Sequence, residues 1–163
     1  MADRPAVRGA GPADHGWILA LNTVHEEALS PLDAGGLVKL TSEALLVRVA
    51  EPQAGFVICF DQDADYESPN FLWFRERYER FAYVDRIAVD GSAARSGTGS
   101  ALYDAVFSEA RRLGYPVVCA EVNTDPPNPV SLAFHEKRGF ETAGEAHLEG
   151  RGKTVRYLVR QLD

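Results

Sequence analysis

Cysteines are few and a long apolar run is missing, and both absences narrow the class of protein. Of 163 residues only two are cysteines, Cys59 and Cys119, and each lies in a short apolar segment typical of a buried strand. We interpret both as reduced core thiols rather than catalytic groups. No segment approaches the ~20 apolar residues that span a membrane, and the first residues lack the apolar core of a secretory leader. We therefore expect a soluble, cytoplasmic protein with no membrane partner.

Basic residues and metal-binding clusters are also scarce. Lys and Arg number 17 against 24 Asp and Glu, which gives a net charge of −7, and no stretch concentrates the basic residues. We therefore expect no nucleic acid as a main partner. The segment HEEAL at 25–29 lacks the second histidine of a His-Glu-x-x-His motif, and no Cys/His cluster has metal spacing. We predict no metal.

Apolar periodicity predicts one α/β domain over residues 1–163, in which residues 1–13 form a loose lead-in rich in Gly, Pro and Ala. The predicted helices are 15–29, 37–44, 71–81, 97–113 and 128–140. The predicted strands are 45–49, 55–60, 82–89, 116–123, 140–148 and 154–160. The alternation of strands and helices at the centre implies parallel pairing there, with antiparallel flanks. We expect one mixed sheet of about six or seven strands with helices on both faces.

The segment ARSGTGSALYDAVF at 94–107 places two glycines, Gly97 and Gly99, directly before a helix. A P-loop is excluded because it needs a lysine in the turn, and the lysines are Lys39, Lys137 and Lys153. A dinucleotide fingerprint is disfavoured because Leu102 occupies its third glycine position. Two interpretations remain: a sharp turn without a ligand, or successive N–H groups that wrap a pyrophosphate at the positive end of the helix.

A second motif, NPVSLAFHEKRGF, follows about thirty residues later, at 128–140. Together, YVDRIAVDGSAARSGTGSALYDAVF and EVNTDPPNPVSLAFHEKRGFETAGE, over about residues 82–146, resemble the GNAT superfamily of N-acetyltransferases. The resemblance implies a GNAT-like fold and acetyl-CoA as co-substrate. It also implies transfer of the acetyl group to a primary amine, on a small molecule or a peptide, directly within a ternary complex.

The resemblance also assigns cofactor contacts. The family pattern Gln/Arg-x-x-Gly-x-Gly/Ala binds the coenzyme A pyrophosphate, and its first position falls on Ala94, with the arginine displaced to Arg95. The strand at 87–89 would pair with the pantetheine arm as an added strand, and Asn128 matches an asparagine that contacts it. The implied cofactor residues are Ile87, Ala88, Val89, Arg95, Ser96, Gly97, Thr98, Gly99, Ser100, Asn128, Ser131 and Phe134.

Catalytic residues follow from the same comparison. The family often has a tyrosine seven residues after that asparagine, where it protonates the departing thiolate, and His135 occupies this position. An imidazole can do the same work, although a histidine that only packs there is an equal alternative. A carboxylate is needed to deprotonate the amine, and we prefer Glu121 over Asp85. Alternation along 83–87 places Asp85 on the sheet face opposite Arg86.

The acceptor site is the least defined part. Acidic and aromatic segments at 21–33 and 63–73 suit an amine-bearing or cationic acceptor, and we predict contacts from Asn22, His25, Tyr66 and Trp73. Two other functions stay open: a non-catalytic module that binds acyl-CoA, supported by the absent tyrosine, and, less favoured, a nucleotide-binding oxidoreductase. A homodimer is compatible with the sequence.

Overall fold

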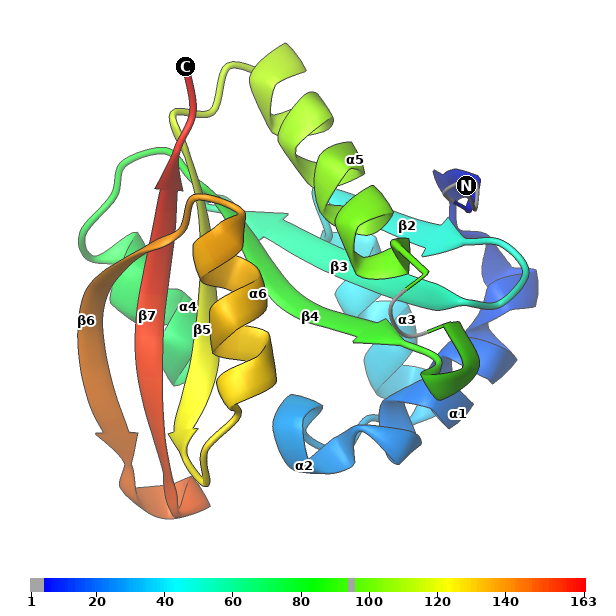
Figure 1. Ribbon diagram of the computed structural model, residues 1–163, viewed down its shortest axis with the longest axis horizontal. Coiled ribbons are helices and arrows are strands. Elements are labelled where there is room, and N and C mark those ends of the chain that lie inside the picture. The colour runs from blue at the N-terminus through cyan, green and yellow to red at the C-terminus, as the bar shows by residue number, and fades with distance from the viewer. Residues whose placement is uncertain (1–4, 94–95) are drawn as a thin grey trace.

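The computed structural model describes residues 5–93 and 96–163, which form a sheet in the order β1-β2-β3-β4-β5-β7-β6 (Figure 1). The strands are β1 (Val7–Gly9), β2 (Leu46–Ala50), β3 (Gly55–Asp61), β4 (Ala82–Val89), β5 (Val117–Asp125), β6 (Glu141–Leu148) and β7 (Lys153–Gln161). β4 and β5 pair in parallel, whereas the other neighbours pair antiparallel. This confirms the mixed sheet predicted from the sequence.

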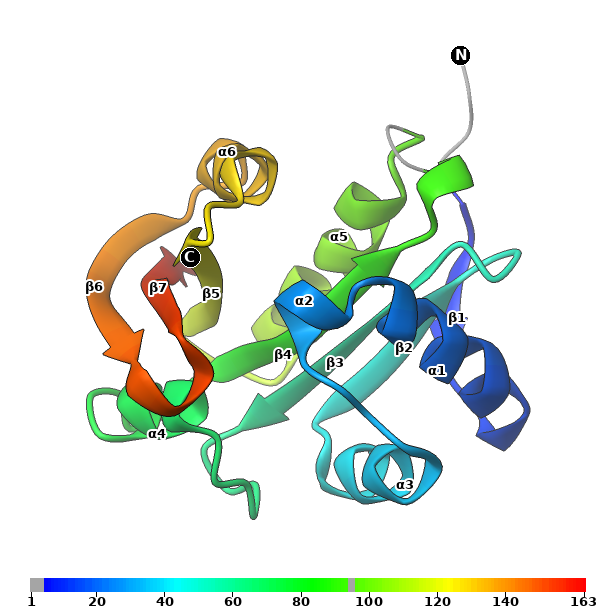
Figure 2. The same cartoon turned by 90° about the horizontal axis from the view of Figure 1, so that it is seen from below.

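The pairing of β4 with β5 is confined to the beginning of the two strands. Ala82 pairs with Val118 and Tyr83 with Cys119, and beyond these pairs the strands diverge (Figures 1 and 2). The two halves of the sheet, β1–β4 and β5–β7, therefore open like a V toward the carboxyl ends of β4 and β5. Ligands of open α/β sheets bind outside the carboxyl ends of the strands, so this opening is the natural position for a site.

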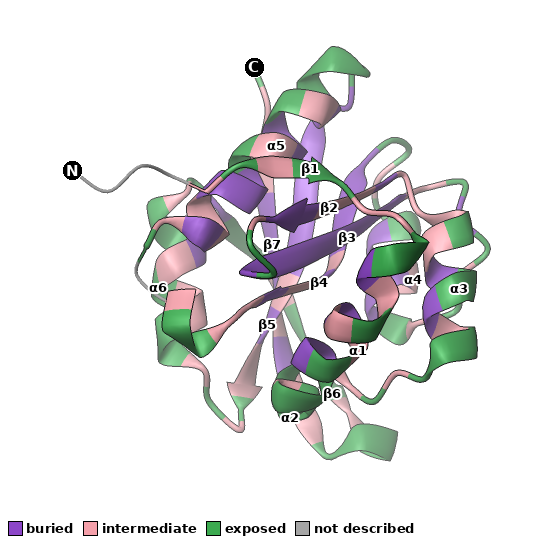
Figure 3. Cartoon of the chain, turned by 90° about the vertical axis from the view of Figure 1, so that its right-hand side faces the viewer, coloured by how far each residue is buried: buried purple, intermediate pink, exposed green. Residues whose placement is uncertain are grey.

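Helices cover both faces of the sheet (Figure 2). One face carries α1 (His15–Val24), α2 (Glu26–Leu29), α3 (Ala34–Glu43) and α4 (Pro69–Arg75), and the other carries α5 (Thr98–Arg112) and α6 (Pro129–Lys137). The apolar side chains form two matching clusters, one with Ile18, Leu37 and Phe71 against Phe56, and one with Leu102 among its buried members. Figure 3 shows β2 and β3 buried between helices whose outer faces are exposed.

β4 contains a β-bulge at Asp85. In β3, Cys59 is the partner of Val84 and Ile58 is the partner of Arg86, so Asp85 is an additional residue in β4. The bulge cancels the strict alternation of side chains, and Arg86 Nε lies 2.9 Å from Asp85 Oδ2 in an ion pair. The prediction that Asp85 and Arg86 point to opposite faces of the sheet is therefore wrong.

Three predicted segments differ from the observed elements. β1 forms within the predicted lead-in, because Arg8 pairs with both Asp14 and Glu51. The predicted helix 15–29 is divided at His25. α4 begins at Pro69, since proline is favoured in the first helical turn, and it ends at Arg75, well before the predicted end.

No helix within 5–93 and 96–163 is long and apolar enough to cross a membrane. In the same ranges no group of three or more His, Cys, Asp or Glu side chains could hold a metal ion. Cys59 and Cys119 are buried and unpaired, and burial raises the pKa of both thiols. Both thiols are therefore protonated at neutral pH.

Candidate active site

The opening between β4 and β5 contains a cavity of about 780 Å³. Residues from both helical layers line it, so the cavity passes from the α5 and α6 side of the sheet to the α1, α2 and α4 side. Most of the predicted site residues come together here. They are His25, Tyr66, Asp85, Ile87, Ala88, Val89, Gly97, Thr98, Gly99, Ser100, Glu121, Asn128, Ser131, Phe134 and His135.

Other predicted residues lie elsewhere. Asn22 is fully buried, and its side chain bonds Arg86 Nη1 and the carbonyl oxygen of Ser30, so it positions other groups. Trp73 stacks on Tyr157 with ring centroids 4.2 Å apart, and it lines no part of this cavity. Ser96 is exposed and bonds the Thr98 hydroxyl. Arg95 lies outside the described residues.

The glycine turn lines the cavity where α5 begins. Gly97 precedes α5 with φ of 87°, a left-handed conformation that favours glycine. A Cβ on Gly99 would lie 3.1 Å from Phe134 Cζ, so this glycine allows α6 to pack closely against the turn. The first N–H groups of α5 have no partner within the helix, and the helix dipole adds positive potential there. An anionic group fits this end of the cavity.

Arg138 provides a further positive charge beside the turn. It follows α6, its guanidinium bonds the Ser100 hydroxyl, and it lies 4.7 Å from the centroid of the Phe134 ring. Its Nε is buried and has no hydrogen-bond partner in the described part of the chain. A buried donor without a partner is costly, so an anion held at the turn would complete this arrangement.

The edge of β4 that faces the opening provides backbone groups. Ile87, Ala88 and Val89 pair with β3 on one side only, because β5 has already diverged. His25 Nε2 lies 3.1 Å from the carbonyl oxygen of Val89 and so connects the α1–α2 segment to this strand. The remaining edge groups of 87–89 can pair with an extended ligand.

Glu121 is the carboxylate at the base of the cavity. Its Oε1 accepts hydrogen bonds from Tyr83 at 2.9 Å and from Asn70 at 3.1 Å. Its Oε2 is buried and has no hydrogen-bond partner among the described residues. Burial, and secondarily the charge of Asp85, raise the pKa of Glu121 to about 8. This group can therefore accept a proton near neutral pH.

Asp85 is fully engaged by protein groups. The Tyr66 hydroxyl donates to its Oδ1 at 2.7 Å, and Arg86 donates to its Oδ2. A carboxylate with partners on both oxygens has less capacity to take a proton from a ligand than one with a free oxygen. Of the two carboxylates, Glu121 is therefore the one with an oxygen that a ligand can use.

His135 is buried, and both ring nitrogens have partners. Nδ1 lies 2.7 Å from the carbonyl oxygen of Ser131, and Nε2 lies 2.5 Å from the hydroxyl of Tyr103. Burial, and then the charge of Arg138, lower the pKa of His135. A neutral ring that donates a hydrogen bond from Nδ1 must accept one at Nε2. The Tyr103 hydroxyl is therefore the donor of the hydrogen bond to His135 Nε2.

Several residues of the site were not predicted from the sequence: Asn70, Tyr83, Tyr103, Arg86 and Arg138. Of these residues, Tyr103 could most readily have been predicted from the sequence. It lies one turn into the helix that follows the glycines and on the apolar face of that helix. Arg138 directly precedes the glycine of the second motif. The roles of Asn70 and Tyr83 depend on contacts between distant segments.

Comparison with known proteins gives a consistent result. A sequence model of the acetyltransferase (GNAT) family matches residues 39–140. No curated protein is similar enough in sequence to match. Among solved structures, Ard1 from Thermoplasma volcanium superposes with a TM-score of 0.77 at 20% identity, covering 100% of this chain and 99% of that one.

Two further solved structures have the same fold. The ribosomal-protein-S18-alanine N-acetyltransferase from Escherichia coli gives a TM-score of 0.69 at 16% identity, covering 97% of this chain and 94% of that chain. The structure of yncA from Salmonella typhimurium with its cofactor acetyl-CoA gives a TM-score of 0.68 at 20% identity, covering 99% of this chain and 95% of that chain. At such identities the likeness concerns the fold.

Proposed function

Because the chain belongs to the acetyltransferase (GNAT) family, we propose that it transfers the acetyl group of acetyl-CoA to a primary amine on a small molecule or peptide. The transfer is direct, with both substrates held in the cavity between β4 and β5. One observation carries this proposal: Glu121, whose Oε2 has no hydrogen-bond partner among the described residues, lines the same cavity as the glycine turn. The buried free thiols of Cys59 and Cys119 support a cytoplasmic location.

The co-substrate supplies an acetyl group already activated as a thioester. The N–H groups of Thr98, Gly99 and Ser100 would hold its pyrophosphate, together with Arg138. The edge of β4 at 87–89 would hold the pantetheine arm as an added strand, and an N–H group of this edge would polarise the thioester carbonyl. Asn128 caps α6 by accepting from the N–H of Ser131, which leaves its amide nitrogen for the pantetheine.

Glu121 deprotonates the acceptor. An amine in its ammonium form has no lone pair for attack, so a base must remove a proton first. The free Oε2 of Glu121 is available for this, directly or through water, while Tyr83 and Asn70 fix the other oxygen. The raised pKa of about 8 makes this carboxylate a stronger base than an exposed glutamate.

The rival functions make different demands. A dinucleotide fold needs a glycine at 102 for close helix–strand contact, whereas Leu102 is fully buried in the apolar cluster under α5. An acyl-CoA sensor has no use for a buried carboxylate with a free oxygen, because that arrangement is costly. Glu121 therefore favours the enzyme.

The proposal is tested by titrating the protein with acetyl-CoA and, in parallel, with NADH in a calorimeter. A panel of primary amines is then assayed for release of free CoA thiol and for acetylated product by mass spectrometry. Binding of acetyl-CoA with turnover on at least one amine supports the proposal. Binding without turnover on any amine supports the sensor, and selective NADH binding supports the oxidoreductase.

Arg138 should contribute to cofactor affinity. We expect Arg138→Gln to raise the Kd for acetyl-CoA by about tenfold, because a charge-assisted contact to phosphate is lost. The control Arg112→Gln removes an exposed arginine of α5 that pairs with Glu109. Calorimetric titration measures both. Equal affinity of wild type and Arg138→Gln would remove Arg138 from the cofactor site.

The Tyr103–His135 pair should supply the proton for the departing thiolate: the Tyr103 hydroxyl turns from His135 Nε2 to the sulfur and gives up its proton, and a proton released by the acceptor amine replaces it through water. Tyr103→Phe and His135→Phe should each lower kcat by about 10²-fold, with little change in the KM for acetyl-CoA. The double variant should lose little more than the stronger single variant, because the two groups act as one unit. A parallel fall in affinity and kcat in either single variant would indicate a packing role instead.

A further inference from the structure

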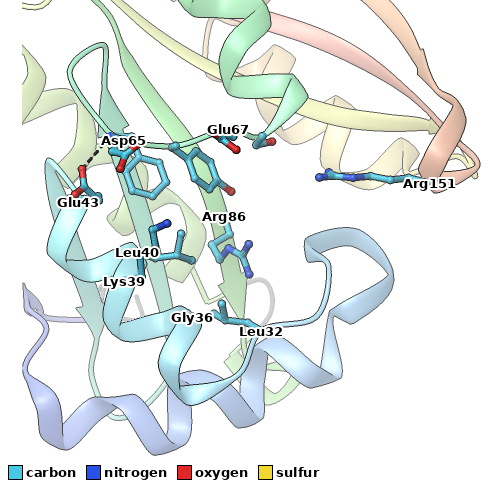
Figure 4. A pocket seen from close by; sticks show the side chains of 12 residues that line it. Leu32, Gly36, Lys39, Leu40, Glu43, Asp65, Glu67, Arg86 and Arg151 are labelled. Carbon is cyan, nitrogen blue, oxygen red and sulfur yellow. Dashed lines mark hydrogen bonds between the residues drawn. The ribbon is translucent and has the colours of Figure 1, made fainter.

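A second cavity of about 540 Å³ adjoins the first on the α3 side of the sheet (Figure 4). Tyr66, Ser68, Arg86 and Arg151 line both cavities, so the two spaces communicate. The second cavity is remote from the glycine turn, which lines only the first. It is therefore positioned to hold the part of an acceptor that lies beyond the reacting amine.

Arg86 is the buried charge of this second cavity. Its side chain is 7% exposed, and the β4 bulge directs it to the same side as Asp85. Its Nε donates to Asp85 and its Nη1 donates to Asn22 Oδ1, both at 2.9 Å. The Tyr66 hydroxyl also interacts with the guanidinium, so three groups hold it in one orientation, out of a capacity of five N–H donors. The remaining donors are available to a ligand.

Arg151 adds a charge from the opposite side. It lies in the turn between β6 and β7, and Figure 4 shows its guanidinium extended toward the space beside Arg86. Within the described ranges Arg151 forms no ion pair with Asp or Glu. It is also near the base, since its charge opposes the rise that burial gives the pKa of Glu121. Arg151 therefore lies between the predicted amine position and the second cavity.

Two of the three acidic residues of the second cavity, Glu43 and Asp65, lie away from this pair. Glu43 accepts a hydrogen bond from the backbone N–H of Asp65 at 2.9 Å, and Figure 4 shows these two residues on the opposite side of the cavity from Arg151. Glu67 lies on the loop above Arg86. The junction of the cavities thus presents two guanidinium groups, and that of Arg151 has no carboxylate partner in the described part of the chain.

We propose that the acceptor is an amine that also carries a carboxylate or similar compact anion, for which a free amino acid is the simplest case. Arg86 and Arg151 bind the anion at the junction, and the amine points to Glu121. The inference rests on the proposed acetyl transfer. Two guanidinium groups match the planar, bidentate geometry of a carboxylate, and they disfavour a polyamine, whose second charge would meet Arg151.

The experiment compares each of the twenty common L-amino acids with its own carboxamide, with spermidine as a polyamine. Wild type, Arg151→Gln and the control Arg111→Gln are assayed for kcat/KM at saturating acetyl-CoA. Arg111 is an exposed arginine of α5 that lines neither cavity. The same acids and amides are titrated calorimetrically into the protein with and without CoA.

We expect at least one acid to exceed its amide at least tenfold in kcat/KM. Arg151→Gln should lower kcat/KM about tenfold more for the acid than for its amide. The amide should lose only the smaller part that follows from a further rise in the pKa of Glu121, whose rise Arg151 opposes. Arg111→Gln should change neither. Equal use of acids and amides, or preferred use of spermidine, would overturn the inference but leave acetyl transfer intact. If no amine is acetylated, the proposed function fails, and the calorimetric preference for acids over amides then decides the inference alone.

Discussion

Replacement of Glu121 by Gln is expected to lower kcat/KM by about 10²- to 10⁴-fold, the usual effect of losing a general base. Gln retains the volume of Glu121, and its amide oxygen can still accept from Tyr83 and Asn70. It cannot take a proton from the ammonium form of the acceptor. Acetyl-CoA affinity should stay within about twofold, because Glu121 lies at the amine end of the cavity.

The pH dependence gives this prediction a second measurement. Only the carboxylate form of Glu121 is active, so kcat/KM of the wild type should rise with pH through the pKa of about 8. An amine acceptor titrates too, and two acceptors whose amines differ in pKa separate the effects. A midpoint that stays near 8 belongs to the enzyme. In Glu121→Gln that midpoint should be missing.

As the pH rises, the stability of the folded protein should fall while kcat/KM rises. The pKa of Glu121 is raised from 4.5 to about 8, so between these values the folded protein binds the proton more tightly than the unfolded chain. The free energy of unfolding of the wild type therefore falls as the pH rises through this window. Glu121→Gln lacks this loss, which urea unfolding at pH 5 and pH 9 can measure.

A matched control is Glu145→Gln, which neutralises a glutamate of β6 that pairs with Arg156. Its kcat/KM and pH profile should equal those of the wild type. If Glu121→Gln retains wild-type activity at all pH values, Glu121 is not the base and Asp85 becomes the next carboxylate to replace.

Replacement of Gly99 by Asp is expected to weaken acetyl-CoA binding by at least about 100-fold. The new carboxylate would lie at the helix end where a pyrophosphate binds, and like charges a few ångströms apart in a partly buried site repel by several kcal/mol. The fold should persist, since a negative residue in the first turn of a helix interacts favourably with the helix dipole. Calorimetric titration and thermal unfolding measure the two quantities.

Gly99→Ala is the control that separates charge from shape. Its Cβ meets Phe134 at the same 3.1 Å, and it carries no charge. We expect a loss of a few-fold in affinity, because Phe134 must shift slightly. If the two variants lose affinity equally, steric displacement of Phe134 explains the effect, and the glycine turn is not a pyrophosphate site.

The sequence predicted the parts of the molecule that depend on local patterns. Gly97 and the apolar period after it predicted α5, and Asn128 followed by Pro129 predicted the start of α6. These signals are short-range, because capping and turn formation involve neighbouring residues. The family resemblance then predicted that the two motifs form one cofactor site. In the described chain, all the predicted cofactor residues except Ser96 line one cavity.

The features that the sequence did not predict depend on contacts between distant segments of the chain. β1 is stabilised by Arg8, which reaches Glu51 across the sheet, and no local pattern at 7–9 indicates this. The bulge at Asp85 depends on the register against β3. Tyr103 meets His135 only because α5 and α6 pack beside each other. Pairing of this kind is set by tertiary structure, which a single sequence does not display.

The parting of β4 from β5 has a consequence for how this enzyme can change over evolutionary time. The glycine turn and Arg138 lie at the ends of α5 and α6 in one layer, whereas Arg151 and the loop at Tyr66 are connecting segments on the other side of the sheet. Substitutions in surface turns are tolerated more readily than those in packed helices. Substitutions in these turns could therefore change the acceptor specificity during evolution, while the binding site of the acetyl donor stays the same.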